Sequence, residues 1–452
     1  MIKKYVVFMI LLLLQCFNVV ASSEVHDPLS RKKNFTNDAE FLTYIQKQYF
    51  EYMWSGAEPS SGLARVRLLT ADPDKDKDII TVGGSGFGIA GLIVGIERGF
   101  VSRKQGVARI GKIVAFLVKA QKHHGMFPHW IRGGTGETIP FANPASKDNG
   151  GDIVESAFMM ESLLCVRQYL KDGSKKEREI ASAIDKLWRE MDWNWYRNGN
   201  DFLFWHWSEN YGWEKNFPLR GYNETLMPYL LASSSPTHPV EKSVYYNGWG
   251  RGGTMVNNGS RYGIPFIVQH NTGDDLVGPM FWTFFSYIGF DPRGLKDEME
   301  INYYKVNVNQ AKIQYAYCVE NPKGFKGYGN NCWGMTAGYS VKGYKAHNLK
   351  NDLGVISPTA ALSAFPYTPV ESMAALKHYY FDLGDQLWGE YGFYDGFSQT
   401  ENLWLKNYLA NNQCTVVPMI ENYRTGLLWK LFMSCPEVQL GLKKLGFTPD
   451  NN

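Results

Sequence analysis

Apolar residues recur at the three-to-four-residue spacing of an α-helix along most of the chain. In the stretch 37–54, Phe41 and Ile45 fall on one helix face, and Asn37 followed by Glu40 predicts a capped start. Comparable stretches follow at 86–99, 103–124, 152–170, 176–192, 223–232, 276–287, 297–318, 369–383, 401–411, 418–432 and 436–445. Convincing β-strand alternation is rare, so the chain is predicted to be all-α.

Long loops rich in glycine and aromatic residues separate these helices. They cover residues 125–151, 193–222, 233–275, 321–357 and 386–400. Loops longer than about 15 residues are uncommon in compact domains unless they serve a site. Helix pairs with elaborate loops on one face predict an (α/α)6 toroid of six helical hairpins, with short strands within 193–275. A plain helical bundle is the alternative, but its loops would be shorter.

The first 22 residues have the layout of a secretory signal peptide. Lys3-Lys4 form a basic start, an apolar run extends from Val6 to Leu14, and Val19-Val20-Ala21 resembles a cleavage site. Because the apolar run is too short to cross a bilayer, we expect an exported protein, periplasmic or secreted, without a transmembrane segment. Lipid anchoring through Cys16 is the weaker alternative, since a glutamine precedes it. No Pro/Ser-rich linker divides the remainder, so residues 23–452 are predicted to form one domain.

Composition narrows the classes of partner. The formal net charge is only +3, and no basic run is interleaved with aromatic residues, so neither nucleic acid nor a membrane surface is an expected partner. Aromatic residues make up 15% of the chain. Since sugars present flat C–H faces that stack on aromatic rings, this content favours a glycan-handling protein. The alternative interpretation is a core built from large rings.

The densest acidic pattern places Asp148, Asp152 and Glu155 at positions i, i+4 and i+7. This spacing brings three carboxylates together near a helix N-terminus, beside apolar residues. Glycoside hydrolysis needs one carboxyl group to protonate the leaving oxygen and another to activate water or attack the sugar. Neighbouring negative charge and partial burial raise one pKa and keep that group protonated. The alternative is structural: Asp152 caps the helix and Glu155 is a solvated first-turn residue.

Further candidates stand beside aromatic residues. Glu224 opens an apolar helix after an aromatic loop, and a first-turn structural role is its alternative. His129 precedes a glycine-rich loop and is expected either to bind a sugar hydroxyl or to fix that loop. Asp395 lies in an acidic-aromatic turn and is a candidate base or subsite residue. The predicted substrate-binding residues are His129, Trp130, Trp205, His206, Trp207, Tyr222, Tyr394 and Asp395.

Competing chemistries lack their motifs. Residues 83–88 are glycine-rich before an apolar helix but lack the lysine and Ser/Thr of a phosphate loop, so their glycines are expected to permit close packing. The sequence has no G-x-S-x-G elbow and no H-E-x-x-H pattern. The cysteines outside the predicted signal show no zinc spacing. No metal and no other cofactor is expected.

Five segments together resemble the glucoamylase-like proteins of glycoside hydrolase family 144, the endo-β-1,2-glucanase family. They are Phe127-Pro128-His129-Trp130, the acidic segment 148–155, Gly221-Tyr222-Asn223-Glu224, Gly392-Phe393-Tyr394-Asp395 and Glu421-Asn422-Tyr423-Arg424-Thr425-Gly426. The resemblance implies an (α/α)6 toroid, export, and anomer-inverting hydrolysis of β-1,2-linked glucan. It also implies that the essential acids are Asp148, Asp152, Glu155 and Glu224.

The sequence thus predicts an exported β-1,2-glucanase that acts as a monomer on an oligo- or polysaccharide. We expect Glu155 to be the general acid, Asp152 or Asp148 to orient or activate water, and Glu224 to complete the subsite or share the base role. Endo action and exo release of sophorose both remain open. The alternative functions are a non-catalytic periplasmic glycan-binding protein and a hydrolase for another glucan linkage.

Overall fold

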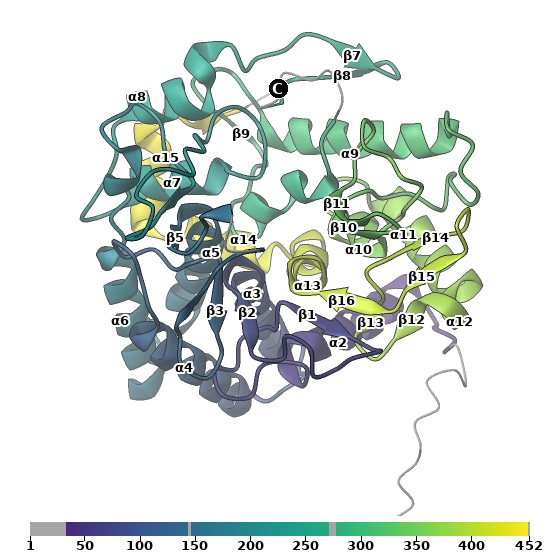
Figure 1. Cartoon of the computed structure of the whole chain (residues 1–452), viewed down its shortest axis with the longest axis horizontal. Coiled ribbons are helices and arrows are strands. Elements are labelled where there is room, and N and C mark those ends of the chain that lie inside the picture. Colours follow the sequence, from purple (N-terminus) through teal and green to yellow (C-terminus); the bar gives the residue numbers. More distant parts are fainter. Residues whose placement is uncertain (1–32, 143–145, 271–276, 451–452) are drawn as a thin grey trace, which may run out of the picture. The chain divides into compact units, whose positions relative to one another are not determined.

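Within the described residues, five helices, all labelled in Figure 1, have side chains that are buried on nearly every side. They are α3 (Val82–Glu97), α5 (Ile153–Leu170), α7 (Leu226–Ser234), α10 (Pro358–Ser363) and α13 (Ala410–Arg424). A helix that is buried on all sides must pack against neighbouring elements on all sides. In this protein α3 packs against both α5 and α13, α5 also packs against α7, and α13 against α10. The five helices therefore form a continuous inner layer.

Helices that bury one face lie around this layer. They are α2 (Asp38–Trp54), α4 (Arg103–Lys119), α6 (Lys175–Glu190), α9 (Tyr303–Glu320), α11 (Pro369–Lys377), α14 (Leu427–Met433) and α15 (Pro436–Lys444). In α6, for example, Ile180, Ile184 and Leu187 are buried at helical spacing, and the opposite face is exposed. Helix α6 packs on α5, α2 on α3 and α13, α11 on α10, and α15 on α7.

This computed structural model describes residues 33–142, 146–270 and 277–450. The predicted signal peptide, its cleavage site and Cys16 lie outside the described residues. By their contacts, residues 34–452 group into one compact unit. In the part of the chain that the structure describes, no helix combines the length and apolar character that crossing a membrane requires.

Short elements fill the connections. The short helices are α8 (Lys242–Val244), α12 (Gly384–Leu387), η2 (Trp195–Arg197), η3 (Tyr245–Trp249), η4 (Arg251–Gly253), η5 (Met280–Thr283), η6 (Phe285–Tyr287) and η7 (His378–Asp382). The strands are β1 (Arg67–Leu69), β2 (Ile79–Thr81), β3 (Trp130–Arg132), β4 (Thr138–Ile139), β5 (Gly151–Asp152), β6 (His206–Trp207), β7 (Ser260–Arg261), β8 (Ile264–Pro265), β9 (Leu295–Lys296), β10 (Ala337–Ser340), β11 (Gly343–Ala346), β12 (Trp388–Gly389), β13 (Gly392–Phe393), β14 (Gly396–Ser398), β15 (Leu403–Leu405), β16 (Asn407–Leu409) and β17 (Thr448–Pro449).

Two of the small sheets gather distant segments around the start of α5. The sheet β2–β3–β4 aligns Thr81 with Trp130, and β5–β6 aligns Asp152 with His206, both in antiparallel register. The strands of these two sheets come from different parts of the sequence, and each strand is only two or three residues long. The sheets are therefore local clamps on a helix-rich fold, in agreement with the predicted helical class.

Local sequence signals account for several helix starts. The Asn37 side chain accepts a hydrogen bond from the Glu40 N–H at 2.9 Å, as the predicted cap requires. The glycines of α3 permit close helix packing, as expected, because a Cβ on Gly86 would lie 2.5 Å from the carbonyl oxygen of Phe158 in α5. The cysteines of the described residues are all buried and free.

The helix predicted at 401–411 is wrong. Strands β15 and β16 occupy most of this range, and β16 pairs antiparallel with β1 while β15 pairs with β14. A short apolar run carries too little periodicity to separate a strand from a helix. These residues form strands because they find backbone partners in the folded protein. The partner of β16 is β1, which lies far away in the sequence, and the partner of β15 is the neighbouring β14. The helix predicted at 276–287 is likewise broken, into η5 and η6 over its described part.

Candidate active site

Asp152 caps the N-terminus of α5. Its Oδ1 atom accepts hydrogen bonds from the backbone N–H groups of Val154 and Glu155, both at 2.9 Å. The first N–H groups of a helix have no partner within the helix, and the partial positive charge there favours a carboxylate. The side chain of Asp152 is fully buried, so the cap also fixes its orientation.

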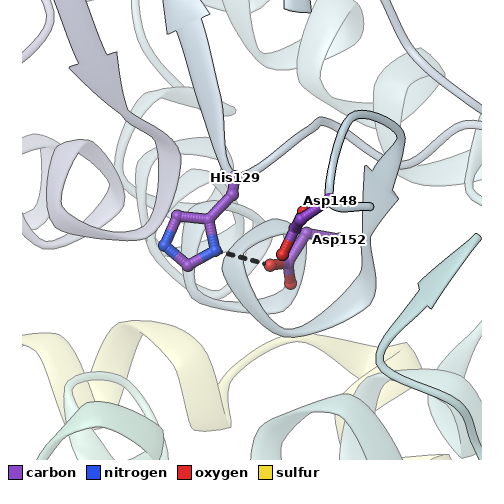
Figure 2. A group of neighbouring side chains, drawn as sticks. All are labelled: His129, Asp148 and Asp152. Atoms are coloured by element: carbon purple, nitrogen blue, oxygen red, sulfur yellow. Dashed lines mark hydrogen bonds and ion pairs between the residues drawn. The ribbon is translucent and has the colours of Figure 1, made fainter. Parts of the chain in front are cut away.

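The second oxygen of Asp152 binds two further side chains. Oδ2 accepts a hydrogen bond from Nδ1 of His129 and another from Nε1 of Trp205, each at 2.8 Å. Figure 2 shows the His129–Asp152 contact, with Asp148 beside it. Both oxygens of Asp152 are thus engaged, and this carboxylate positions His129 and Trp205, which immediately precede β3 and β6.

Glu155 lies one turn further along α5 and meets the start of α3. Its Oε2 atom accepts hydrogen bonds from the Gly83 N–H at 2.7 Å and from the Thr81 hydroxyl at 3.3 Å. Nε2 of His129 lies 3.8 Å from Oε1 of Glu155. A Cβ on Gly83 would lie 2.6 Å from Oε2, so only glycine permits this approach.

Asp148 lies behind the same cluster and is paired with a cation. Its Oδ2 atom accepts a hydrogen bond from the ammonium group of Lys215. Its Oδ1 atom lies 3.6 Å from Nε2 of His206, which accepts the Gly150 N–H at 3.0 Å. Burial lowers the pKa of His206 despite the nearby carboxylates, and a neutral ring is the form that can accept this bond.

Two adjoining cavities border these residues. The larger, of about 740 Å³, is lined by Val66, Arg67, Asp76, Ile79, Thr81, His129, Trp130, Ile139, Pro140, Phe141, Ala142, Val154, Glu155, Phe158, Trp205, Glu224, Phe281, Phe285, Ala337, Tyr339, Tyr344, Leu409, Asn411 and Asn412. The smaller has about 230 Å³. Trp205, Glu224 and Phe281 line both cavities. Glu155 and Glu224 therefore share one aromatic-walled cavity, and Glu224 lies where the two cavities meet.

The two carboxyl groups on the cavity wall have raised pKa values. Burial, reinforced by the charges of Glu155 and Asp152, raises the pKa of Glu224 to about 7. Burial also raises the pKa of Glu155, although the charge of His129 and the Gly83 N–H oppose the shift. A carboxyl group that stays protonated near neutral pH can donate a proton to a leaving group.

His129, which lines the cavity, forms an ion pair with Asp152 behind the wall. Burial alone would lower the pKa of His129, but the carboxylates of Glu155 and Asp152 outweigh it and raise the pKa to about 9. Burial likewise opposes ionisation of Asp152, yet the hydrogen bond and charge of His129 lower its pKa. The ring of His129 also stacks on Phe141, with centroids 3.7 Å apart. The imidazolium is therefore held in one place by Asp152 and Phe141.

The cluster of His129, Asp148 and Asp152 has donor atoms within 4.8 Å of one another, as a metal site would. Its contacts, however, are those of a charge network. His129 donates a hydrogen bond from Nδ1 to Asp152, and Lys215 neutralises Asp148. These cations already supply the positive charge that a metal ion would bring, so we assign the cluster to positioning the cavity wall.

The structure brings together only part of the predicted site. Glu155, Glu224, His129, Trp130 and Trp205 line the larger cavity. The predicted residues outside both linings are Asp148, Asp152, His206, Trp207, Tyr222, Tyr394 and Asp395.

Tyr222 and Asp395 are two of the predicted residues that lie outside both linings. The ring of Tyr222 is fully buried, and its hydroxyl donates to Asn307 at 2.9 Å. Asp395 is also fully buried and accepts hydrogen bonds from Asn412 at 2.7 Å and from the Tyr339 N–H at 3.3 Å. Both residues are therefore held by contacts within the protein. Trp207 packs edge-to-face on Trp195, away from the cavity lining.

Several residues of the wall were not predicted. Arg67, Tyr339 and Tyr344 line the larger cavity, and Phe281 lines both. Lys215, which neutralises Asp148, was also missed. These residues lie in segments without a motif and reach the site only through tertiary contacts.

Known proteins resemble this chain over most of its length. Residues 216–436 match the family model described as "Glycoamylase: Putative glucoamylase". An exo beta-1,2-glucooligosaccharide sophorohydrolase (non-reducing end) of Parabacteroides distasonis is 44% identical over 428 residues, which are 90% of this chain and 58% of the relative. This chain therefore spans little more than half the length of that relative.

Solved structures resemble the fold closely. An endo-beta-1,2-glucanase from Chitinophaga pinensis, in complex with sophorotriose and glucose, is 51% identical with a TM-score of 0.88, over 91% of this chain and 99% of its own. A putative glucoamylase from Bacteroides fragilis NCTC 9343 is 50% identical with a TM-score of 0.89, over 93% of this chain and 100% of its own.

Proposed function

This chain belongs to the glucoamylase-like family of β-1,2-glucanases and sophorohydrolases, and from that membership we propose that it hydrolyses β-1,2-linked glucan by acid–base catalysis. One observation carries the proposal. Glu155 and Glu224 line the same cavity, whose wall also includes Trp130, Trp205 and Phe281. Aromatic faces of this kind suit the C–H faces of a glucan chain, and two carboxyl groups are the machinery of glycoside hydrolysis.

The sequence predicts that Glu155 is the general acid. The surroundings of Glu155 and Glu224 favour different catalytic roles for these two residues. Glu155 accepts the Gly83 N–H and lies beside the cationic His129, and both contacts favour its carboxylate form. Glu224 has a pKa of about 7, so much of it is protonated near neutral pH. We therefore assign the general acid to Glu224 and the general base to Glu155.

In this mechanism Glu224 gives its proton to the glycosidic oxygen as the bond to the anomeric carbon breaks. Glu155 takes a proton from the water that attacks the opposite face of that carbon, so the anomeric configuration inverts. Asp152 and Asp148 act behind the wall. Asp152 orients His129 and Trp205, and Asp148 holds Lys215.

The arrangement of helices supports the predicted (α/α)6 toroid as part of the proposal. The inner helices α3, α5, α7, α10 and α13 would supply five of its six inner positions, with the segment η5–η6 as the sixth, since η6 packs on α7. We further propose that residues 1–22 direct export to the periplasm or the medium and that the mature protein is a monomer.

The purified protein should be incubated with a panel of α- and β-glucans that includes linear β-1,2-glucan, and the products separated by chromatography. The proposal expects new reducing ends from the β-1,2-linked glucan alone. A ladder of oligosaccharides would identify endo action, and sophorose as the sole early product would identify exo action. Binding of the glucan without new reducing ends would instead identify a glycan-binding protein. Products from another linkage would overturn the substrate assignment.

A further inference from the structure

The hairpin of β10 and β11 borders the proposed reaction centre. Its two strands pair so that Tyr339 lies opposite Tyr344. Both rings line the larger cavity together with Glu155 and Glu224. The chain that follows contributes Ala346, Asn348 and Lys350 to the lining of the smaller cavity. Residues 337–350 therefore run from one cavity to the other, past the carboxyl group that both cavities share.

Buried polar contacts anchor the base of this hairpin. Asp395 accepts a hydrogen bond from the Tyr339 N–H at 3.3 Å, and Asn412 donates both to Asp395 at 2.7 Å and to the carbonyl oxygen of Ala337 at 2.9 Å. A Cβ on Gly338 would lie 2.9 Å from Oδ2 of Asp395. Strand β10 is thus fixed to α13, which carries Asn412, and to the loop of Asp395.

Arg67, which lines the same cavity, holds the side chain of Tyr339. Its Nη1 atom donates to the Tyr339 hydroxyl, and its Nε atom donates to Asp76 at 2.7 Å. The two side chains of this ion pair are only 24% and 18% exposed. A guanidinium that is already held by a carboxylate loses little further freedom when it binds a hydroxyl. The contact therefore joins β1 to the hairpin.

Tyr344 presents an aromatic face beside the carboxyl groups. Its ring packs edge-to-face on that of Tyr339, with centroids 5.8 Å apart and planes at 78°, yet 54% of the residue remains exposed. Burial around its hydroxyl, and then the charges of Asp395 and Glu155, raise the pKa of Tyr344. The side chain thus borders the cavity of the reaction centre with about half of the residue exposed.

We propose that Tyr344 is a substrate-positioning residue that stacks on the sugar beside the cleaved bond, and that Arg67 keeps it in place through Tyr339. The inference rests on the proposed hydrolase function. A sugar held against the Tyr344 ring would have its glycosidic oxygen near Glu224. The hairpin would therefore determine how tightly the glucan binds at the bond that is cleaved.

Steady-state kinetics on β-1,2-linked glucooligosaccharides of defined length tests the role of Tyr344. Because a displacement of about 1 Å at a reaction centre can cost about a hundredfold, Tyr344→Ala should lower kcat/KM by about ten- to hundredfold. Tyr344→Phe, which keeps the ring, should retain most of the activity. Val341→Ala is the matched control, since Val341 is 56% exposed at the tip of the same hairpin. If Tyr344→Ala unfolds, Tyr344→Leu tests the loss of the aromatic face alone.

A double-mutant cycle tests the role of Arg67. Arg67→Lys and Tyr339→Phe should each raise KM more than they lower kcat, with unchanged melting temperatures. The double variant should be no worse than the poorer single variant, because both changes break the same contact.

The outcomes separate this inference from the proposed function. Wild-type kinetics in Tyr344→Ala, in an enzyme that otherwise cleaves β-1,2-glucan, would overturn the role of Tyr344. Additive losses in the double variant would overturn the role of Arg67. A wild-type protein that cleaves no β-1,2-glucan would overturn the proposed function itself.

Discussion

The Nδ1 atom of His129 lies 2.8 Å from Oδ2 of Asp152, the residue that caps α5. One carboxylate thus fixes both the start of the helix and the imidazole ring. His129 in turn places Nε2 3.8 Å from Oε1 of Glu155. Asp152, which lies outside the cavity lining, therefore holds the positive charge of His129 next to the carboxyl group of Glu155 on the cavity wall.

Replacing His129 with Asn should destabilise the protein most at mildly acidic pH. The pKa of His129 is raised to about 9 in the folded protein, so its stabilising contribution is complete below its unfolded pKa of about 6.5 and disappears as the pH rises through about 9. The lowered pKa of Asp152 contributes only above its unfolded value of about 3.9. Between about pH 3.9 and about pH 6.5, the unfolding free energy of His129→Asn should be lower than that of the wild type by on the order of 2–3 kcal/mol. Urea unfolding across this pH range measures it, with surface His238→Asn as the control, and a difference independent of pH would contradict the ion pair.

Glu224→Gln should abolish most of the activity and leave the fold intact. Loss of a general acid or base typically costs about 10²–10⁴-fold in rate. The rate of Glu155→Gln should fall by a similar factor. The rate of the double variant should fall little further, because the effects of groups that act as a unit are not additive. Reducing-end release and melting temperature measure both effects. Glu179→Gln, on the exposed face of α6, is the control, and near-normal turnover in Glu224→Gln would remove it from the mechanism.

The pH profile of kcat/KM should be bell-shaped. The rate should fall as the pH rises through about 7, because Glu224 must carry its proton to donate it. It should also fall on the acid side as Glu155 becomes protonated, at a pH above the usual range for a glutamate because its pKa is raised. Initial rates in a series of buffers give both limbs. A rate that keeps increasing above neutral pH would show that Glu224 is not the acid.

Gly83→Ala and Gly88→Ala should differ in their effect on kcat, although both residues lie in α3. A Cβ on Gly83 would lie 2.6 Å from Oε2 of Glu155, whereas a Cβ on Gly88 would meet Cys414 Sγ at an ordinary 3.5 Å. Gly83→Ala should therefore displace Glu155 and reduce kcat. Gly88→Ala should leave kcat unchanged and stabilise the helix by about 0.5–1 kcal/mol. Equal kcat values in the two variants would contradict the close approach of α3 to Glu155.

Local signals in the sequence predicted the helical class and the start of α5. Asp152 followed by Glu155 reads as a helix cap with an acidic first turn, and the structure has this geometry. The same signals predicted no partner for Glu155. Gly83 precedes Glu155 by 72 residues, and nothing in the local pattern around either residue encodes their contact.

Aromatic residues in loops were the least predictable part of the site. Tyr222 stands two residues before Glu224, yet its ring is buried in the core. Tyr344, more than a hundred residues away, lines the cavity with Glu224. A loop has no periodicity that fixes which way a side chain points, so rings of the core and of the cavity have the same appearance in the sequence.

The anomeric form of the first products tests most directly whether Glu155 and Glu224 act across a water molecule. Proton NMR spectra should be recorded within minutes of adding the protein to linear β-1,2-glucan, before the new reducing ends mutarotate. Inversion by these two carboxyl groups predicts that the first signal comes from the α-anomer, with the β-anomer following only by mutarotation. A β-anomer that appears first would require a covalent intermediate and would contradict the account.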